Sequence, residues 1–315
     1  MPPGPSRAGL RHLAPWLVRR TARRAVNRLG GSVSAVIATT LDDVLCSMPG
    51  ARTLFYGTDD HVAGAESHGI PRERWLRAEQ RQLQHADVVA AVSPALQERY
   101  AAYGREAALV PNGCDPAIYA DVDSMSWPAD VHLAGPIAGL VGHIGQRVDL
   151  ALLEAVADTG CSLLLVGPWD PSYEQIRFPA LAARPNVCWV GAKKLAELPA
   201  YLRIIDVGLT PYADSDLNRS SFPLKTLEYI AAGSGVVSTD IPAVAWLQSE
   251  HVTIARSPSE FADAARQQLA LPRSADMITH RRRFSEQHCW ARRATDLADL
   301  LEFDAPQRGC SESRV

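Results

Sequence analysis

Lysine is scarce in this sequence of 315 residues, occurring at Lys193, Lys194 and Lys225, and arginine supplies the remaining cationic charge. Long apolar runs are also missing: none approaches the ~20 residues that a membrane-spanning helix requires. The formal net charge of -3 gives no reason to expect general attraction to nucleic acid. We therefore expect a soluble globular protein with no nucleic-acid partner.

Cysteine pairs with metal-ligand spacing are absent. The six cysteines are scattered and form no CxxC motif, at Cys46, Cys114, Cys161, Cys188, Cys289 and Cys310. The N-terminus is rich in arginine and lacks the apolar core of a secretory signal. Both features favour a reducing, cytoplasmic location.

Residues 9–29 read as a basic amphipathic helix, interrupted near Pro15. Its apolar residues lie among arginines that could meet anionic lipid headgroups, which would place the protein peripherally at the inner face of the membrane. The alternative is an ordinary surface helix whose apolar stripe packs on its own domain. The sequence leaves both open.

Short β-branched runs alternate with helical patterns along the chain, which predicts α/β architecture with parallel, doubly wound sheets. The first series has strands at 32–39, 52–57, 87–93 and 108–113, with helices at 72–86 and 94–104. The second has strands at 136–142, 162–167, 186–191, 206–212, 235–239 and 252–255, with helices at 147–160 and 195–205.

These series predict two Rossmann-like domains. The expected boundaries are 1–113 for a first domain with a basic leader helix, 114–135 for a connection rich in turn formers, and 136–274 for the second domain. Residues 275–315 are expected to form a long helix over 275–301, returning toward the first domain, and a tail.

In open parallel sheets, ligands bind at the carboxyl ends of the strands. The first such loop of the second domain is 142–147, where Gly142 and Gly145 allow a tight turn and leave His143 and Arg147 at the mouth of the sheet. Arg147 at a helix start opposes the helix dipole, so a phosphate would compensate its charge. An exposed ion pair with Asp149 is the alternative.

The stretch "SSFPLKTLEYIAAGSG" (220–235) carries a lysine and a glutamate on an otherwise apolar helix. Lys225 and Glu228 are three residues apart and share one face. A carboxylate there can accept both hydroxyls of a ribose, and an ammonium can meet a phosphate. The alternative is a helical ion pair worth ~0.3–0.5 kcal/mol.

Five segments taken in order resemble the GT-B glycosyltransferases, in particular the retaining, sugar-nucleotide-dependent group (family 4, group 1-like): 88–119, 135–160, 164–170, 185–212 and 222–244. The resemblance covers about Asp87 to Leu271. It implies two Rossmann-like domains facing a cleft, a nucleotide-sugar donor (UDP- or GDP-sugar) on the second, and a glycan, lipid-linked or small-molecule acceptor on the first. The donor would be a substrate, with no cofactor.

By position, the resemblance implies that Glu228 binds the donor ribose, that Trp189, Val190 and Gly191 read the base, and that His143 and Arg147 belong to a cationic pyrophosphate clamp. Because the donor loops carry no acidic cluster, we expect transfer without a metal, with Arg147 and Lys225 stabilising the leaving diphosphate. The remaining expected donor-binding residues are Gly142, Gly145, Pro168, Ser220, Ser221, Phe222 and Leu224.

Two departures from the family pattern stand out. Ser220 replaces the earlier of two family glutamates, and about four strands precede Asn112 where a complete first domain has six or seven. The first domain is therefore expected to be abbreviated, completed by a protein partner, or cut short by a misassigned start of the sequence. Its candidate acceptor-side residues are Asp59, Asp60 and His61, for which an ordinary acidic turn is the alternative.

The departures keep other functions open. A non-catalytic GT-B-like subunit that supports a partner glycosyltransferase is one, and a sugar phosphorylase or epimerase on the same scaffold is another.

Overall fold

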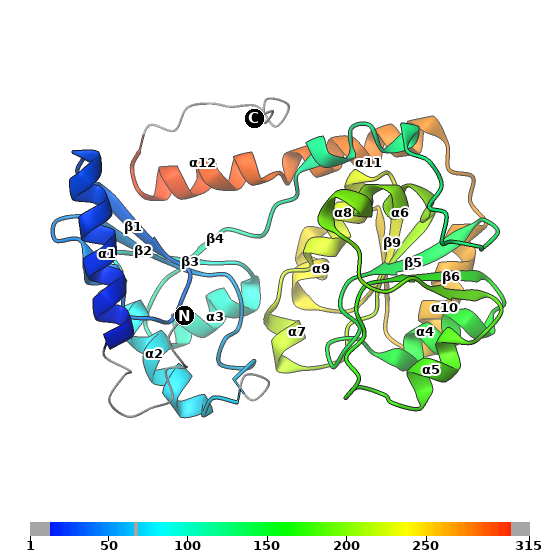
Figure 1. The fold of residues 1–315 in the computed structure, drawn as a ribbon, viewed down its shortest axis with the longest axis horizontal. Coiled ribbons are helices and arrows are strands. Elements are labelled where there is room, and N and C mark those ends of the chain that lie inside the picture. Colours follow the sequence, from blue (N-terminus) through cyan, green and yellow to red (C-terminus); the bar gives the residue numbers. More distant parts are fainter. Residues whose placement is uncertain (1–12, 66–68, 304–315) are drawn as a thin grey trace. The chain divides into compact units, whose positions relative to one another are not determined.

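The computed structural model describes residues 13–65 and 69–303 (Figure 1). The chain divides into two compact units. The first runs to Pro111 and takes back the chain from Asp296, and the second spans Asn112–Thr295. Within the described residues, the chain leaves the second unit inside helix α12 (Trp290–Leu300).

The first unit holds a parallel sheet in the order β1-β2-β3-β4. The strands are β1 (Ala35–Ala38), β2 (Arg52–Gly57), β3 (Val88–Ala91) and β4 (Ala108–Leu109). Its helices are α1 (Leu13–Leu29), α2 (Arg72–His85) and α3 (Pro94–Ala102), with a short 3-10 helix η1 (Leu45–Ser47). The Ser93 hydroxyl accepts from the Leu96 N–H at the start of α3, where Pro94 occupies the first turn.

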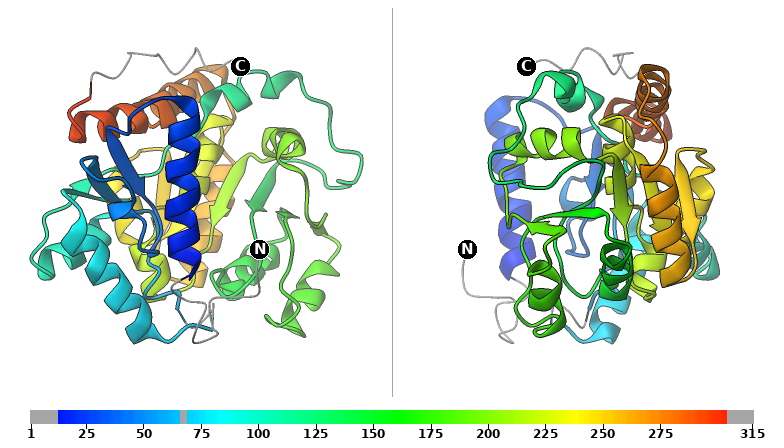
Figure 2. Two further views of the ribbon diagram at one scale, coloured as in Figure 1. Left: turned by 60° about the vertical axis from the view of Figure 1, so that its left-hand side comes forward. Right: turned by 90° about the vertical axis from the view of Figure 1, so that its right-hand side faces the viewer.

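Helix α1 lies beside β1 and β2 (Figure 2). The predicted interruption near Pro15 is wrong, because the helix is continuous from Leu13. Pro15 falls in the first turn, where a backbone N–H would have no partner within the helix. The predicted part of this helix before Leu13 lies outside the described residues.

The second unit holds a six-stranded parallel sheet in the order β10-β9-β8-β5-β6-β7. All six predicted strands are confirmed, slightly shortened: β5 (Ile137–Val141), β6 (Ser162–Val166), β7 (Val187–Trp189), β8 (Val207–Thr210), β9 (Gly235–Thr239) and β10 (Val252–Ala255). The chain fills the sheet from β5 to β7 and then returns to β8 on the other side of β5. The switch point between β5 and β8 is where such sheets bind ligands.

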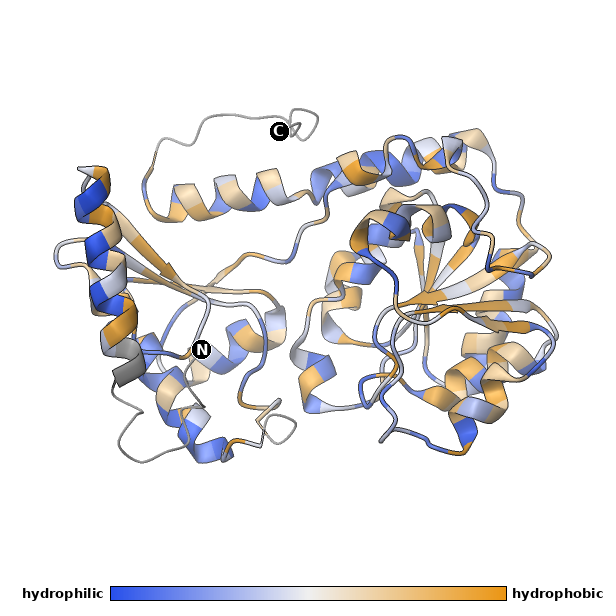
Figure 3. Cartoon of the chain, viewed as in Figure 1, coloured by the Kyte–Doolittle hydropathy of each residue, from blue (hydrophilic) through white to orange (hydrophobic). Residues whose placement is uncertain are grey.

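The helices of this unit are α4 (Leu150–Asp158), α5 (Arg177–Ala182), α6 (Leu198–Ile204), α7 (Asp216–Ser220), α8 (Leu224–Ala231), α9 (Pro242–Leu247), α10 (Pro258–Leu269) and α11 (Ala275–Gln287). Three 3-10 helices accompany them, η3 (Pro116–Tyr119), η4 (Val122–Ser124) and η5 (Leu195–Glu197). The central strands are apolar along their length (Figure 3). They are buried on both faces, as expected for a parallel sheet covered by helices.

Tyr229 fixes α8 to this sheet. Its hydroxyl accepts a hydrogen bond of 2.7 Å from the Val141 N–H at the end of β5. A side chain at Gly208 on β8 would put its Cβ 2.2 Å from Tyr229 Cγ, so the ring needs glycine below it. This contact fixes the position of α8 against the sheet at the switch point.

The long helix expected over 275–301 is instead two helices, α11 and α12 (Trp290–Leu300). Between them, the backbone pairs with Cys114: the Cys114 N–H donates to the His288 carbonyl, and the Trp290 N–H donates to the Cys114 carbonyl, both at 2.9 Å. These bonds replace the helical ones and end α11. Among the helices described, none has both the length and the apolar character needed to cross a membrane.

Candidate functional site

The loops at the carboxyl ends of β5, β6 and β7 are tied together through their backbones. Gly142 N–H donates to the Val166 carbonyl, Gly167 N–H to the Gly191 carbonyl, and Ile144 N–H to the Pro168 carbonyl, each at 2.8 Å. A Cβ at Gly167 would lie 1.9 Å from the Gly142 carbonyl oxygen, and its φ of +142° also favours glycine. The expected residues Gly142, Pro168 and Gly191 thus share one rigid edge.

Arg147 lies in the loop after β5 and is held by two buried side chains from the segment around α7. Its Nε donates to Asn218 Oδ1 and its Nη2 to Ser221 Oγ, both at 2.8 Å. Asn218 is 1% exposed and Ser221 7% exposed, while Arg147 itself remains exposed. The arginine is therefore positioned by the interior and presented to solvent.

The expectation that Arg147 opposes a helix dipole is wrong, because α4 begins at Leu150. Asp149 is the N-cap, and its Oδ1 accepts from the Ala151 N–H at 2.9 Å. The Asp149 carboxylate, which was the alternative ion-pair partner of Arg147, therefore caps the start of α4. Arg147 itself belongs to the loop.

Lys225 and Glu228 form an ion pair of 2.6 Å on the first turns of α8. Their side chains are 33% and 17% exposed, so the pair is partly shielded from water. Glu228 is the more enclosed partner, and its charge contributes to raising the pKa of Cys114 and of Tyr119, after burial as the main cause. The helical ion pair that the sequence left as an alternative is therefore present.

Tyr212 lies within the electrostatic influence of both Arg147 and Glu228. Burial raises its pKa to about 12, the Arg147 guanidinium opposes that rise, and the Glu228 carboxylate adds to it. Arg147 and Glu228 consequently act on one phenol at the end of β8, beside the switch point. Sequence reasoning missed Tyr212 and Asn218, which lie between β8 and α8.

His143 and Gly145 complete the loop after β5. His143 is exposed, and a Cβ at Gly145 would lie 2.7 Å from His143 Cε1. The His143 ring therefore lies over Gly145. It remains accessible at the mouth of the sheet.

An aromatic cluster stands at the ends of β6 and β7. Trp189 is 39% exposed and donates from Nε1 to the Gly167 carbonyl at 2.9 Å. Its ring meets Phe178 and Trp169 edge to face, at centroid distances of 5.1 and 6.3 Å. Val190 N–H donates to the Leu165 carbonyl at 3.0 Å. Trp189 thus offers an anchored aromatic surface next to the backbone of Val190 and Gly191.

The residues before α8 have different environments. Ser220 ends α7, and the Ser221 hydroxyl donates to the Leu217 carbonyl at 2.7 Å while accepting from Arg147. Phe222 is 5% exposed and packs edge to face on Trp246 at 6.2 Å. Leu224 begins α8 and is half-buried. Ser221 and Phe222 therefore support the site from within.

The candidates Asp59, Asp60 and His61 follow β2 in the first unit, at the carboxyl end of its own sheet. Asp60 is 2% exposed and pairs with Arg99 at 2.5 Å, and Arg99 also pairs with the fully buried Glu79 at 2.8 Å. Asp59 accepts from the Asp60 N–H at 2.9 Å, and His61 packs edge to face on Trp75 at 5.5 Å. The Asp60 charge is thus committed to the interior of this unit.

Two parallel sheets flanked by helices, with a cationic and aromatic site at the carboxyl edge of the second, define the chain as a GT-B protein. Residues 137–270, which make up most of the second unit, match the family model for glycosyl transferases group 1. The chain therefore has a GT-B fold, and its residues 137–270 are similar to group 1 glycosyl transferases.

A curated relative supports this assignment. The putative teichuronic acid biosynthesis glycosyltransferase TuaH of Bacillus subtilis (strain 168) is 35% identical over 120 residues, which are 38% of this chain. The match spans about 30% of the relative's own length.

Solved structures show the same fold at low sequence identity. The sucrose-phosphate synthase of Thermosynechococcus elongatus superposes with a TM-score of 0.65 at 21% identity, covering 80% of this chain and 67% of that one. Anabaena HepE in complex with UDP and glucose gives a TM-score of 0.68 at 15% identity, covering 94% and 83%. A glycosyltransferase from Rickettsia africae gives 0.69 at 12% identity, covering 97% and 85%.

Proposed function

We propose that this protein is a glycosyltransferase that moves a sugar from a nucleotide-sugar donor to a glycan, lipid-linked or small-molecule acceptor, with retention of anomeric configuration. The observation that carries the proposal is Arg147, an exposed guanidinium fixed by Asn218 and Ser221 at the carboxyl edge of a group 1 glycosyltransferase domain. A preoriented cation of this kind stabilises the charge that develops on a leaving diphosphate.

The other roles follow from the surroundings of Arg147. Glu228 accepts hydrogen bonds from the donor ribose, and Lys225, now paired with Glu228, donates to a phosphate when the donor is bound. Trp189 and the backbone of Val190 and Gly191 hold the base. A uridine nucleotide is the first candidate, because HepE was solved with UDP and UDP-glucose.

The proposed reaction uses no cofactor and no metal at the donor site. Arg147 and Lys225 balance the charge on the diphosphate. Adding a metal chelator should therefore leave donor binding unchanged. A loss of UDP affinity in EDTA, restored by Mg²⁺ or Mn²⁺, would contradict this part of the proposal.

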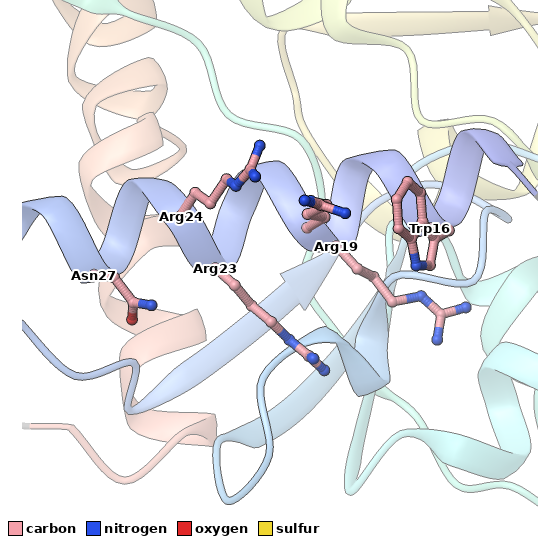
Figure 4. A pocket seen from close by; sticks show the side chains of 6 residues that line it. Trp16, Arg19, Arg23, Arg24 and Asn27 are labelled. Atoms are coloured by element: carbon pink, nitrogen blue, oxygen red, sulfur yellow. The ribbon is translucent and has the colours of Figure 1, made fainter.

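The protein acts in the cytoplasm, at the inner membrane face, through α1. Trp16, Leu17 and Val18 are each about half exposed on this helix, at 49%, 47% and 52%. A groove along α1 is lined by Trp16, Arg19, Arg20, Arg23, Arg24 and Asn27 (Figure 4). Exposed apolar and cationic side chains on one helix are what an anionic lipid surface binds.

Two of the arginines hold α1 to its own unit. Arg19 pairs with Asp43 at 2.6 Å, and Arg23 donates to the Ser47 carbonyl at 2.7 Å. Arg20, stacked on Trp16 at 5.0 Å, and Arg24 are exposed. Each such charge is worth about 1 kcal/mol at an anionic surface, so the double change Arg20→Glu with Arg24→Glu should weaken binding more than about tenfold.

Co-sedimentation with phosphatidylserine-containing vesicles tests the membrane proposal. Binding by wild type should fall steeply between about 0.1 and 1 M salt, because the Debye length shrinks from about 10 to 3 Å. The control Arg266→Glu on α10 should bind like wild type. Equal binding by the double variant, or binding insensitive to salt, would contradict the proposal.

The enzymatic proposal is tested by titrating the purified chain with UDP, GDP and ADP and their sugars in a calorimeter, followed by donor hydrolysis and acceptor assays. A folded sample that binds one of the nucleotides with 1:1 stoichiometry and releases it from its sugar supports the proposal. A folded sample that binds none of them would instead favour a non-catalytic subunit. Product NMR then shows whether the anomeric configuration is retained.

A further inference from the structure

Glu250, His251 and His280 come together on the second unit, at the edge of the sheet opposite to the donor loops. Glu250 and His251 precede β10, so they lie at its amino end, and His280 projects from the middle of α11. One ligand atom of each lies within 4.8 Å of the others, and His280 Nδ1 is 3.8 Å from Glu250 Oε1. The two imidazole rings meet edge to face at 5.1 Å.

We propose that Glu250, His251 and His280 form a binding site for a divalent transition-metal ion, with Zn²⁺ as the best match. This site is separate from the proposed glycosyl transfer and does not depend on it. Two imidazoles and one carboxylate are a ligand set that Zn²⁺ accepts, leaving one position for water. Mg²⁺ and Ca²⁺ prefer an all-oxygen set and fit poorly.

The observed spacing is close to what coordination requires. Ligands at about 2.1 Å from a tetrahedral ion lie about 3.4 Å from one another. The 3.8 Å between His280 and Glu250 is already near that value, and the widest separation, at most 4.8 Å, needs to close by up to about 1.4 Å. The side chains of His280 and Glu250 are 63% and 74% exposed, so side-chain rotation alone supplies that movement.

His251 is the anchor of the site. Its carbonyl accepts from the Val236 N–H on β9 at 3.0 Å, and its own N–H donates to Ser249 Oγ at 3.2 Å. Its ring is partly buried and packs edge to face on Phe284 at 5.5 Å. Backbone and ring are therefore fixed before an ion arrives, while the other two ligands adjust to it.

One nearby charge opposes a cation. Arg281 follows His280 on α11, and its Nη1 donates to the Gly233 carbonyl at 3.0 Å, which directs the guanidinium to the end of α8. Glu250 offsets this charge within the site. An ion bound here would join α11 to the start of β10, and α11 continues through Cys289 into α12. The ion therefore has a structural role, holding α11 to the sheet.

Metal titration of a tag-free, chelator-treated full-length chain tests the site. We expect one Zn²⁺ to bind per chain, with a rise in melting temperature, and Co²⁺ to give the visible absorption of a four-coordinate site. His280→Ala and Glu250→Gln should each weaken binding at least tenfold and remove the thermal shift. The control His85→Ala, an exposed histidine at the end of α2, should behave as wild type.

A third variant, His251→Ala, removes the partly buried ligand and can fail to fold. In that case His280→Ala tests the site, because His280 is largely exposed and tolerates truncation. Absence of Zn²⁺ binding by wild type, or binding of equal strength in His280→Ala and Glu250→Gln, would overturn the proposal. Nucleotide binding measured on the same variants should stay unchanged. Zinc binding and nucleotide binding are separate measurements, so the zinc-site proposal and the proposed function can each be contradicted without the other.

Discussion

Arg147 and Asn218 hold each other through two hydrogen bonds across 71 positions of sequence. Arg147 Nε donates to Asn218 Oδ1 at 2.8 Å, and Asn218 Nδ2 donates back to the Arg147 carbonyl at 2.9 Å. A second amide hydrogen goes to the Ala213 carbonyl at 2.8 Å. One almost fully buried amide thus orients both the backbone and the side chain of the exposed arginine, which makes Asn218 a positioning residue.

Replacing Asn218 should therefore weaken the site without removing its charge. We expect Asn218→Ala to raise the Kd for the donor nucleotide about tenfold, since the guanidinium loses its fixed direction. In a double-mutant cycle, adding Asn218→Ala to Arg147→Ala should cost little more affinity than Arg147→Ala alone. Additive losses, measured by calorimetry on folded variants, would show that Asn218 acts independently of Arg147.

The cluster of Arg99, Asp60 and Glu79 should govern the stability of the first unit. Arg99→Ala leaves two carboxylates enclosed without their cation, and breaking a buried pair in this way costs roughly 3–5 kcal/mol. Urea unfolding, followed by a probe in the first unit, measures the loss. The matched control is Arg177→Ala on the surface, whose ion pairs with Glu154 and Glu174 are exposed and should contribute about 1 kcal/mol or less. Equal losses would contradict this account of the cluster.

Gly167→Ala should be strongly destabilising because two penalties combine. The backbone is in a conformation that favours glycine, and the added Cβ would approach the Gly142 carbonyl oxygen to 1.9 Å. Gly160→Ala is the control, since its φ is +80° but the added Cβ has nothing within 4 Å. Strain alone costs about 1–3 kcal/mol. We expect Gly167→Ala to lose more unfolding free energy than Gly160→Ala. Equal losses would mean that the loops after β5 and β6 are not rigidly joined.

His288 should make the second unit less stable in mild acid. Burial, reinforced by the positive charge of Arg293, lowers the pKa of His288 from 6.5 to about 4. Between these values the unfolded chain binds a proton that the folded chain does not, so stability is full above pH 6.5 and falls as the pH drops toward 4. Allowing for its partial exposure, the loss is about 1–2 kcal/mol.

Unfolding free energies measured from pH 7 to pH 4 check this expectation. His288→Gln should flatten the curve relative to wild type by the amount assigned to His288. A variant curve parallel to that of wild type would show that other groups cause the acid sensitivity.

The second sheet could be predicted in detail because its strands are short apolar runs separated by glycine and helical patterns. All six were found within a few residues, and so was the helix carrying Lys225 and Glu228. The local period of apolar residues determines these elements, and the parallel topology then places the loops at one edge.

Other features could not be predicted because they depend on contacts between distant segments. Nothing near His288 in the sequence indicates that Cys114 will pair with the backbone there and divide a helix. The partners of Arg147 lie more than seventy residues away, and the nearby Asp149 was the more obvious candidate. Likewise, the sequence predicted Asp60 as an acceptor-side residue, with an acidic turn as the alternative, because its partner Arg99 belongs to another helix and nothing local indicates it.

The central claim is that the carboxyl edge of the second sheet binds the diphosphate of a nucleotide-sugar through Arg147, with Glu228 on the ribose. Calorimetric titration of the donor nucleotide into wild type, Arg147→Ala, Glu228→Ala and the control Arg266→Ala tests it most directly. We predict at least about tenfold weaker binding for the first two variants, with unfolding free energies within about 1 kcal/mol of wild type, and unchanged binding for Arg266→Ala. Wild-type affinity in a folded Arg147→Ala protein would contradict the account.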